Sequence, residues 1–233
     1  MTTILALDSS SDACSVALLH HGTLFTQFEL AAKSHTQRLL PMVDEMLSVH
    51  GVALSQVDAI AFGRGPGSFT GLRICMGVVQ GLAFGADRPV IPVSTLHAIA
   101  HEFAQANPDN NLPIAVALDA RMQEVYWGVY SQSGDVLEPE TVIKPAELLI
   151  QSSLLSQAVP CVGLGQGWSY PELAAVSVNE KQLDVYASAG AMATLAERVW
   201  SAGGAIPIEQ AEPVYLRDSV TWQKRERIRK EAL

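Results

Sequence analysis

Short apolar runs separated by turn-forming residues predict strands at the start of the 233-residue chain. Residues 4–22 contain four apolar residues, an aspartate, five turn-like residues and a second apolar run. This order is typical of a strand, a tight turn and an antiparallel return strand. Residues 23–30 predict a third strand, so the chain opens with a three-stranded meander.

The apolar spacing then changes to a helical period. Residues 34–51 open on Ser34 and close on glycine, with apolar residues at positions 39, 40, 43, 46 and 47. Pro41 lies inside this segment, so we expect either a kinked helix or a helix that starts near Leu40 with proline in its first turn. Further strands at 57–63 and 89–93 and helices at about 68–85 and 94–105 give the order βββαβαβα.

The opening hairpin recurs 111 residues further along the chain. Residues 115–134 repeat its pattern and place Asp119 where the first copy has Asp8. Any two hairpins share some of this pattern, but the matching aspartate favours an internal duplication. The sequence NPDNN at residues 107–111 predicts a linker between the copies.

A meander followed by alternating helices and parallel strands is the layout of an actin-like α/β domain pair, the ribonuclease H-like fold of sugar kinases and Hsp70. We expect a βββαβα lobe at residues 1–108, a shorter second lobe at 109–217 and a basic tail at 218–233. In this architecture the two aspartate-containing hairpins face each other across a cleft.

Residues 63–73, GRGPGSFTGLR, raise the question of a phosphate-binding loop. Neither the Rossmann fingerprint nor the P-loop fits, because the glycine spacing is wrong and Leu72–Arg73 replaces the P-loop lysine. The loop therefore favours a turn from a strand into a helix capped by Ser68. An anion site at this helix start, helped by Arg64 or Arg73, stays open, and the weak anion or nucleotide candidates are Asp8, Arg64, Gly65, Gly67, Ser68 and Asp119.

The helix after this loop is apolar on every side of its helical wheel. A surface helix normally shows one apolar stripe, so a helix of this kind is expected to be buried all round. One face can cover the sheet, and the other needs either the 34–50 helix or a second protein. A central helix buried within one chain is the alternative.

Composition narrows the function classes. Hydrophobic residues make up 48% of the chain and charged residues 17%, which favours apolar surface that meets a partner. The net charge is −9, and from Arg217 onwards six basic residues face three acidic ones, so subtracting this +3 leaves −12 for the rest. An acidic body disfavours tight RNA binding by this chain alone. The tail either contacts RNA or a partner, or is a solvated terminus.

We expect a cytoplasmic protein without a membrane span. No apolar run reaches the roughly 18 to 20 residues that a membrane span needs, and the first residues lack the basic start and apolar middle of a signal peptide. Cys14, Cys75 and Cys161 are widely spaced in apolar settings, which is typical of buried thiols in a reducing compartment.

Residues 63–85, followed by PVIPVSTL, resemble the TsaB (YeaZ) family. LALDSSSDACSVAL, SHTQRLLPMVDEML, ALDARMQEVYW and AEPVYLRD resemble the same family, so the similarity spans nearly the whole chain. It implies an actin-like fold and a non-catalytic platform for TsaD, working with the ATPase TsaE and with TsaC. Together these install threonylcarbamoyl on adenosine 37 of tRNAs that read codons starting with A.

The resemblance also implies that the first two helices bind TsaD or another TsaB as a homodimer, and that tRNA is met only through the complex. No cofactor of its own is implied, and ATP or ADP belongs to the complex. The implied partner-binding residues are His35, Leu39, Met42, Val43, Met46, Leu72, Cys75, Met76, Val78, Val79 and Leu82.

An enzyme is the competing hypothesis: an actin-like ATPase or phosphotransferase, or a metallopeptidase. His97 and His101 have metal-site spacing, but position 98 is alanine where a zinc peptidase has glutamate. In TsaD, which this region resembles, the metal-binding histidines would fall on Thr95 and Ile99, so we expect surface histidines and no metal. Residues 9–12 lack the glycine and basic residue expected around a transferred phosphate, and Trp168 crowds a possible relic adenosine loop at residues 162–168.

Overall fold

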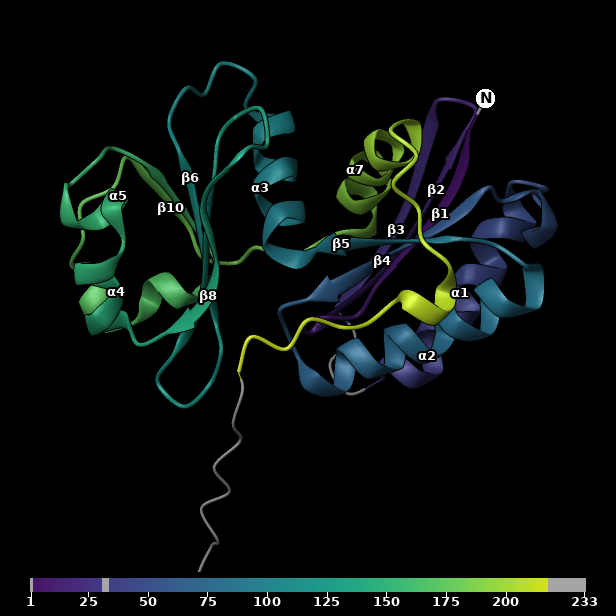
Figure 1. Cartoon of the computed structure of the whole chain (residues 1–233), viewed down its shortest axis with the longest axis horizontal. Coiled ribbons are helices and arrows are strands. Elements are labelled where there is room, and N and C mark those ends of the chain that lie inside the picture. Colours follow the sequence, from purple (N-terminus) through teal and green to yellow (C-terminus); the bar gives the residue numbers. More distant parts are fainter. Residues whose placement is uncertain (1, 31–33, 218–233) are drawn as a thin grey trace, which may run out of the picture.

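The computed structural model describes residues 2–30 and 34–217, which form two five-stranded mixed sheets (Figure 1). The strands of the first sheet are β1 (Thr3–Asp8), β2 (Ala13–His20), β3 (Thr23–Leu30), β4 (Ala59–Gly65) and β5 (Val90–Ser94). Their order in the sheet is β3-β2-β1-β4-β5. The meander β1–β2–β3 is antiparallel, whereas β4 and β5 run parallel to β1.

The second sheet repeats this topology. Its strands are β6 (Ile114–Asp119), β7 (Val125–Tyr130), β8 (Val136–Ile143), β9 (Val162–Leu164) and β10 (Glu180–Gln182), in the order β10-β9-β6-β7-β8. β6 pairs antiparallel with β7 and parallel with β9, as β1 does with β2 and β4. The predicted duplicated actin-like α/β fold is confirmed, and β6 begins 111 residues after β1.

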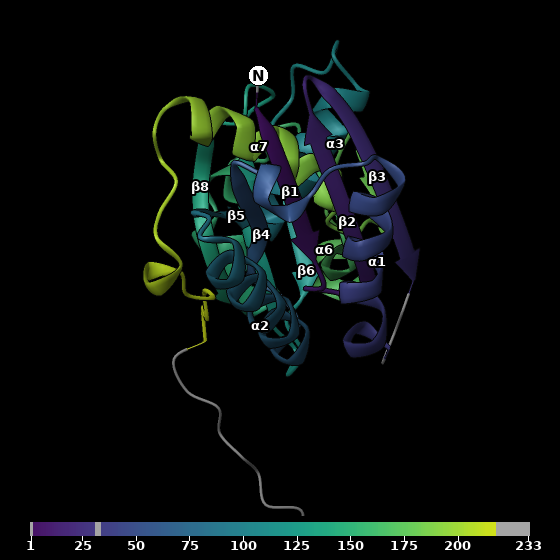
Figure 2. The ribbon, with the colours of Figure 1, turned by 90° about the vertical axis from the view of Figure 1, so that its right-hand side faces the viewer.

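Helices cover both faces of each sheet. On the outer face of the first sheet, α1 (His35–Val49) and α2 (Phe69–Ala86) lie side by side, joined by the 3₁₀ turn η1 (Leu54–Gln56) and β4 (Figure 2). Between the sheets lie α3 (Thr95–Ala106) and α7 (Ala189–Ser201). The outer face of the second sheet carries only short helices: α4 (Pro145–Gln151), α5 (Ser153–Ser156), the 3₁₀ turn η2 (Gln166–Ser169) and α6 (Pro171–Ala174).

Strand alternation divides the first sheet between two cores. Leu5 and Leu7 of β1 face the core under α1 and α2, whereas Ile4 and Ala6 face the core shared by both sheets with α3 and α7. Both sheets therefore contribute to one core, in which α7 packs on the first sheet and α3 contacts strands of both.

Two expectations need correction. α1 begins at His35, so the helix does not start near Leu40, and Pro41 lies in its second turn. α7 lies within residues 109–217 but packs on β1, β2 and β4, so its assignment to the second lobe is wrong. The chain returns to the first lobe because α7 is apolar along its buried face and completes the core between the sheets. It then reaches the 3₁₀ turn η3 (Ile208–Gln210) beside the first sheet.

Candidate functional site

The glycine loop connects β4 to α2 and is covered by the chain's own β1–β2 turn. Ser68 caps α2 by accepting a hydrogen bond from the Gly71 amide at 3.3 Å, as predicted, and its own amide donates to the Ser10 carbonyl at 2.7 Å. A Cβ at Gly67 would lie 2.4 Å from the Ser10 carbonyl oxygen, and one at Gly71 would lie 1.9 Å from that of Ser9. These glycines let two backbone segments meet, which supports a structural turn.

Asp8 lies at the end of β1, fully buried beneath this loop. Its Oδ2 accepts hydrogen bonds from the Ser10 amide at 3.2 Å and hydroxyl at 3.0 Å, while its buried Oδ1 has no partner. Burial raises the pKa of Asp8 to about 7, against the lowering effect of the Ser10 hydrogen bonds. A Cβ at Gly63 would lie 2.0 Å from Oδ1, so the carboxyl group is sealed from solvent.

Asp119 occupies the equivalent position in the second sheet but is partly exposed. It accepts hydrogen bonds from the Arg121 amide at 2.8 Å, the Arg121 guanidinium at 3.0 Å and the Tyr170 hydroxyl at 3.0 Å. Asp8 and Asp119 therefore have different surroundings and share no hydrogen-bond partner.

The two arginines of the proposed anion site are engaged elsewhere. The Arg64 guanidinium donates to Glu140 of β8 at 3.1 Å. Arg73 lies over the Phe69 ring, 3.7 Å from its centroid, and donates to the Tyr215 hydroxyl at 3.4 Å. The glycine loop lies against Asp8, but both guanidinium groups are engaged in other contacts, so neither arginine completes an anion site there.

Glu140 forms an interlobe polar cluster that was not predicted. Its carboxylate accepts hydrogen bonds from Arg64 and Ser94 of the first sheet and from the Tyr130 hydroxyl of its own sheet, the last at 3.1 Å. His97 stacks on the Tyr130 ring with 4.9 Å between centroids. These residues lie 10 to 76 positions from Glu140, so no local sequence pattern indicates the cluster.

Both histidines of α3 make contacts within the chain. His101 is buried, not on the surface as expected, and its Nε2 lies 2.9 Å from the Thr194 hydroxyl of α7. Burial lowers the pKa of His101 to about 4, so it packs as a neutral ring. Within residues 2–30 and 34–217, no group of three or more His, Cys, Asp or Glu side chains could hold a metal ion.

The suspected adenosine loop at residues 162–168 is filled by the chain's own packing. Trp168 is buried, donates to the Ala115 carbonyl at 3.1 Å and lies where a Cβ of Gly163 would contact its ring, so it fills the suspected adenosine loop.

Cys14, Cys75 and Cys161 are buried free thiols, as predicted. Burial raises the pKa of Cys14 and Cys161 to about 11, which disfavours the nucleophilic thiolate.

Most implied partner-binding residues are buried inside the chain itself. Packing of α1 and α2 on the first sheet covers His35, Leu39, Met42, Val43, Met46, Leu72, Cys75, Met76 and Val79. These nine side chains line the chain's own core in this structure, and their contact with a partner stays a prediction. Val78 and Leu82 are partly exposed and remain available.

The opposite face of α2 is apolar and exposed. Phe84 is 79% exposed, a Cβ at Gly77, Gly81 or Gly85 would meet no atom within 4 Å, and no charged residue stands between Arg73 and Asp87. By length and composition alone, the helix is long and apolar enough to cross a membrane. Its other face is packed into the core, so only the exposed face lacks a partner among the described residues.

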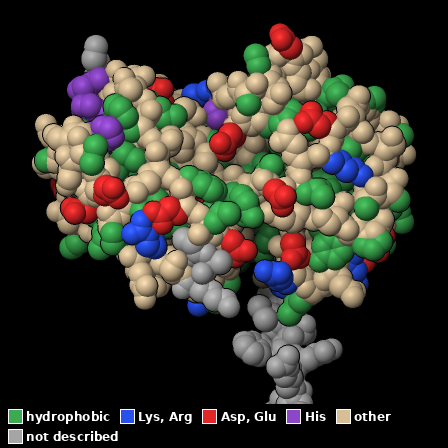
Figure 3. Space-filling model, turned by 180° about the vertical axis from the view of Figure 1, so that it is seen from behind, with side chains coloured by type: hydrophobic (Ala, Val, Ile, Leu, Met, Phe, Trp, Pro, Cys, Tyr) green, Lys and Arg blue, Asp and Glu red, His purple; other side chains and the backbone are tan. Residues whose placement is uncertain are grey.

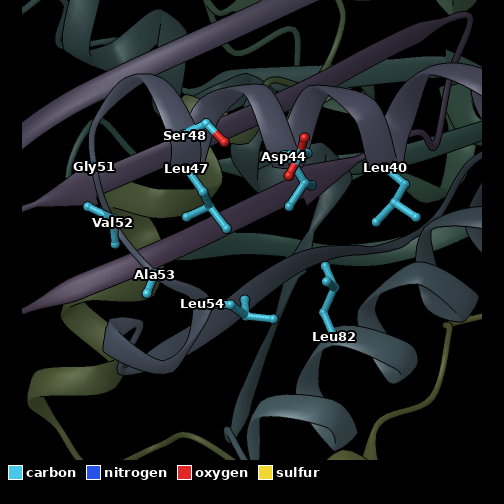
Figure 4. Close-up of a pocket in the computed structure, with 10 residues that line it drawn as sticks. Leu40, Asp44, Leu47, Ser48, Gly51, Val52, Ala53, Leu54 and Leu82 are labelled. Carbon is cyan, nitrogen blue, oxygen red and sulfur yellow. The ribbon is translucent and has the colours of Figure 1, made fainter.

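A groove runs beside this face, between α1, η1 and α2 (Figure 4). It has a volume of about 420 Å³ and is lined mainly by aliphatic side chains, with Asp44 of α1 on its wall and Leu40, Leu47, Leu54 and Leu82 converging from both sides. We call the exposed face of α2 together with this groove the α1–α2 surface.

Charge does not mark a nucleic-acid site on the back of the molecule. Acidic side chains are spread over both halves of that face, and basic side chains form no continuous patch there (Figure 3). The basic tail at 218–233, a candidate for RNA contact, lies outside the described residues.

Together, the two equivalent sheets and their central helices define a duplicated actin-like α/β protein. The family model described as TsaD, tRNA N6-adenosine threonylcarbamoyltransferase, matches residues 27–223. The chain is 40% identical to the tRNA threonylcarbamoyladenosine biosynthesis protein TsaB of Escherichia coli over 95% of this chain and 97% of that protein. It is 41% identical to the TsaB of Haemophilus influenzae, over 95% and 96% respectively. The chain belongs to the TsaB family, which confirms the resemblance.

Solved structures agree with this assignment. YeaZ from Pseudomonas aeruginosa has a TM-score of 0.81 at 45% identity and covers 93% of this chain and 100% of its own. A second structure, described as an uncharacterized protein with similarity to peptidase YeaZ from Pseudomonas aeruginosa, has a TM-score of 0.84 at the same identity and coverage.

Proposed function

We propose that this chain acts in tRNA threonylcarbamoyladenosine biosynthesis as a non-catalytic subunit that binds and activates TsaD. The observation that carries the proposal is the α1–α2 surface, an apolar helix face and groove on a chain whose candidate catalytic groups are buried or paired. The relatives named for this pathway support the biological setting. The proposed modification is at adenosine 37 of tRNAs that read codons starting with A, and the reaction is proposed to take place in the cytoplasm.

We infer that the chain is non-catalytic from the surroundings of its candidate aspartates and arginines. A phosphotransferase of this fold needs carboxylates that reach a metal-bound phosphate. Asp8 is sealed under the glycine loop, and Arg64 is paired with Glu140. We therefore assign no cofactor to this chain and place any ATP or ADP at the level of the complex.

TsaD and a second copy of this chain are proposed to use the same surface and hence to exclude each other. Both contacts would cover Phe84 and the glycine positions of α2, where close helix approach is possible because a Cβ would meet nothing. TsaE and tRNA would then be met through the assembled complex.

Co-purification with TsaD tests the surface, using Phe84→Glu and Ile150→Glu as a matched pair. Both side chains are 79% exposed, but Ile150 lies on α4 of the second lobe. Phe84→Glu is expected to abolish co-purification without changing the melting temperature, because a charge cannot be desolvated in an apolar contact. Ile150→Glu should bind as wild type does. Retention of TsaD by both variants would reject this surface.

An actin-like ATPase, a phosphotransferase or a metallopeptidase remains the second candidate function. The matching family model is described as a transferase, and one similar structure is described by its similarity to a peptidase. ATP hydrolysis, peptide cleavage and metal content of the isolated chain separate the two hypotheses. A platform gives background values in all three, whereas activity lost in Asp119→Asn would favour the enzyme.

A further inference from the structure

The last described segment of the chain, residues 211–217, connects the two lobes, and we call it the strap. It begins at Ala211, which is buried in the core beneath α1 and α2, and ends at Arg217 on the second lobe. Figure 1 shows this yellow segment crossing from the first lobe towards the second, below α3 and α7.

The strap binds the first lobe at the start of the glycine loop. The Val214 amide donates to the Arg64 carbonyl at 2.7 Å. Gly65 has a φ of +101°, and a Cβ there would lie 3.0 Å from the Val214 carbonyl oxygen. The Tyr215 ring lies 5.5 Å from that of Phe69, at the first residue of α2. The strap therefore follows a backbone path that only glycine leaves open.

The strap binds the second lobe through one side chain. The Arg217 guanidinium donates to the Ala120 carbonyl at 3.1 Å and to the Met122 sulfur at 2.9 Å, and it pairs with Glu124. The guanidinium also donates to the Arg121 carbonyl at 3.4 Å, so all four contacts belong to the β6–β7 turn. Arg121, Met122 and Gln123 of this turn have φ values of 63°, 54° and 61°, a conformation that non-glycine residues rarely adopt in succession. A planar guanidinium with several donors suits such a turn, because it can bind a carbonyl and a carboxylate together.

The lobes are also joined by the shared core around α3 and α7 and by the Arg64–Glu140 pair. Arg64 links the two connections, since its backbone binds the strap and its side chain binds β8. Apolar contacts are non-directional, so the lobes can rotate about the shared core. The hydrogen bonds and the ion pair of the strap are directional and favour one orientation of the lobes.

We propose that the strap sets the orientation of the two lobes about the α3–α7 core, and that the contacts of Arg217 hold the strap on the second lobe. Release of Arg217 separates the β6–β7 turn from the glycine loop. This inference does not depend on the proposed role with TsaD.

Pulsed electron paramagnetic resonance on the full chain tests whether the strap sets the orientation of the lobes. Spin labels are placed at Thr70→Cys in α2 and Glu172→Cys in α6, both exposed, and the native cysteines are buried. Thr70 follows Phe69, and Glu172 lies close to Tyr170, which bonds to Asp119 at the β6–β7 turn. Wild type should give one narrow distance, and Arg217→Ala should add a longer one. Amide exchange at Val214 should rise about tenfold or more in the same variant.

Arg121→Ala is the matched control, because it removes an exposed arginine from the same turn while keeping the backbone carbonyls that Arg217 uses. It should leave both readouts at the wild-type value, and Arg217→Lys should lie between wild type and Arg217→Ala. An unchanged distance in Arg217→Ala would overturn the proposal, whether or not Val214 exchanges faster, because the strap would then not hold the lobes.

Discussion

The β1–β2 and β6–β7 turns occupy equivalent positions in the two sheets but are covered differently. Ser9 and Ser10 of the first turn are buried under the glycine loop, which approaches them through Gly67 and Gly71. Arg121, Met122 and Gln123 of the second turn are exposed and held by Arg217. The same strand pairing thus places one aspartate in the core and the other at the surface, so position in the fold does not determine a carboxylate's chemistry.

The outer helices differ in the same way. The first sheet carries α1 and α2, of 15 and 18 residues, whereas the second carries α4, α5 and α6, of 7, 4 and 4 residues. Only the longer pair offers an extended apolar face with a groove beside it. The two lobes share a topology, and the longer helices of the first lobe give it the surface that the proposed function needs.

Substitution of the glycines in α2 should give the largest stability difference. Gly71→Ala places a Cβ 1.9 Å from the Ser9 carbonyl oxygen, so we expect it to lower the free energy of unfolding by about 3 kcal/mol. Gly77→Ala meets no atom within 4 Å and should raise the same free energy by about 0.5–1 kcal/mol through helix propensity. Urea unfolding measures both. Equal effects would show that the glycine loop does not seal the first turn.

Asp8→Asn should have a pH-dependent effect of intermediate size. The pKa of Asp8 is about 7 in the folded chain and 3.8 as the reference value, so the folded state retains a proton that the unfolded state loses. The stability that this group contributes is complete below pH 4 and is lost as pH rises towards 7. The gain of Asp8→Asn over wild type should therefore grow by about 1 kcal/mol per pH unit in that window. A constant difference between pH 4 and 8 would contradict the buried, neutral carboxyl.

Asp119→Ala should have the smallest effect, about 1 kcal/mol or less. The substitution removes a partly exposed ion pair with Arg121 and one hydrogen bond from Tyr170. Thermal unfolding of this variant and of Asp8→Asn under the same conditions compares how much each aspartate contributes to the free energy of unfolding. A loss of several kcal/mol would mean that the second turn is as integral to its lobe as the first.

The fold could be predicted because its signals are local. The hairpins, the Ser68 cap and the repeat around Asp8 and Asp119 are all encoded within short windows of sequence. The buried side of α2 could not be predicted, because both sides of the helix are apolar and only packing against the sheet separates Val79 from Phe84. Pairing of Arg64 with Glu140 and the return of α7 to the first sheet join distant positions, for which one sequence carries no signal.

The most direct test of the platform account is threonylcarbamoyladenosine formation on tRNA in a reaction reconstituted from TsaC, TsaD, TsaE and variants of this chain. We predict that Asp8→Asn and Asp119→Asn keep activity near the wild-type level, because neither carboxylate takes part in the chemistry. Phe84→Glu should lower activity about tenfold or more while the folded chain stays intact, through lost contact with TsaD. Full activity with Phe84→Glu, together with loss of activity in either aspartate variant, would contradict the account.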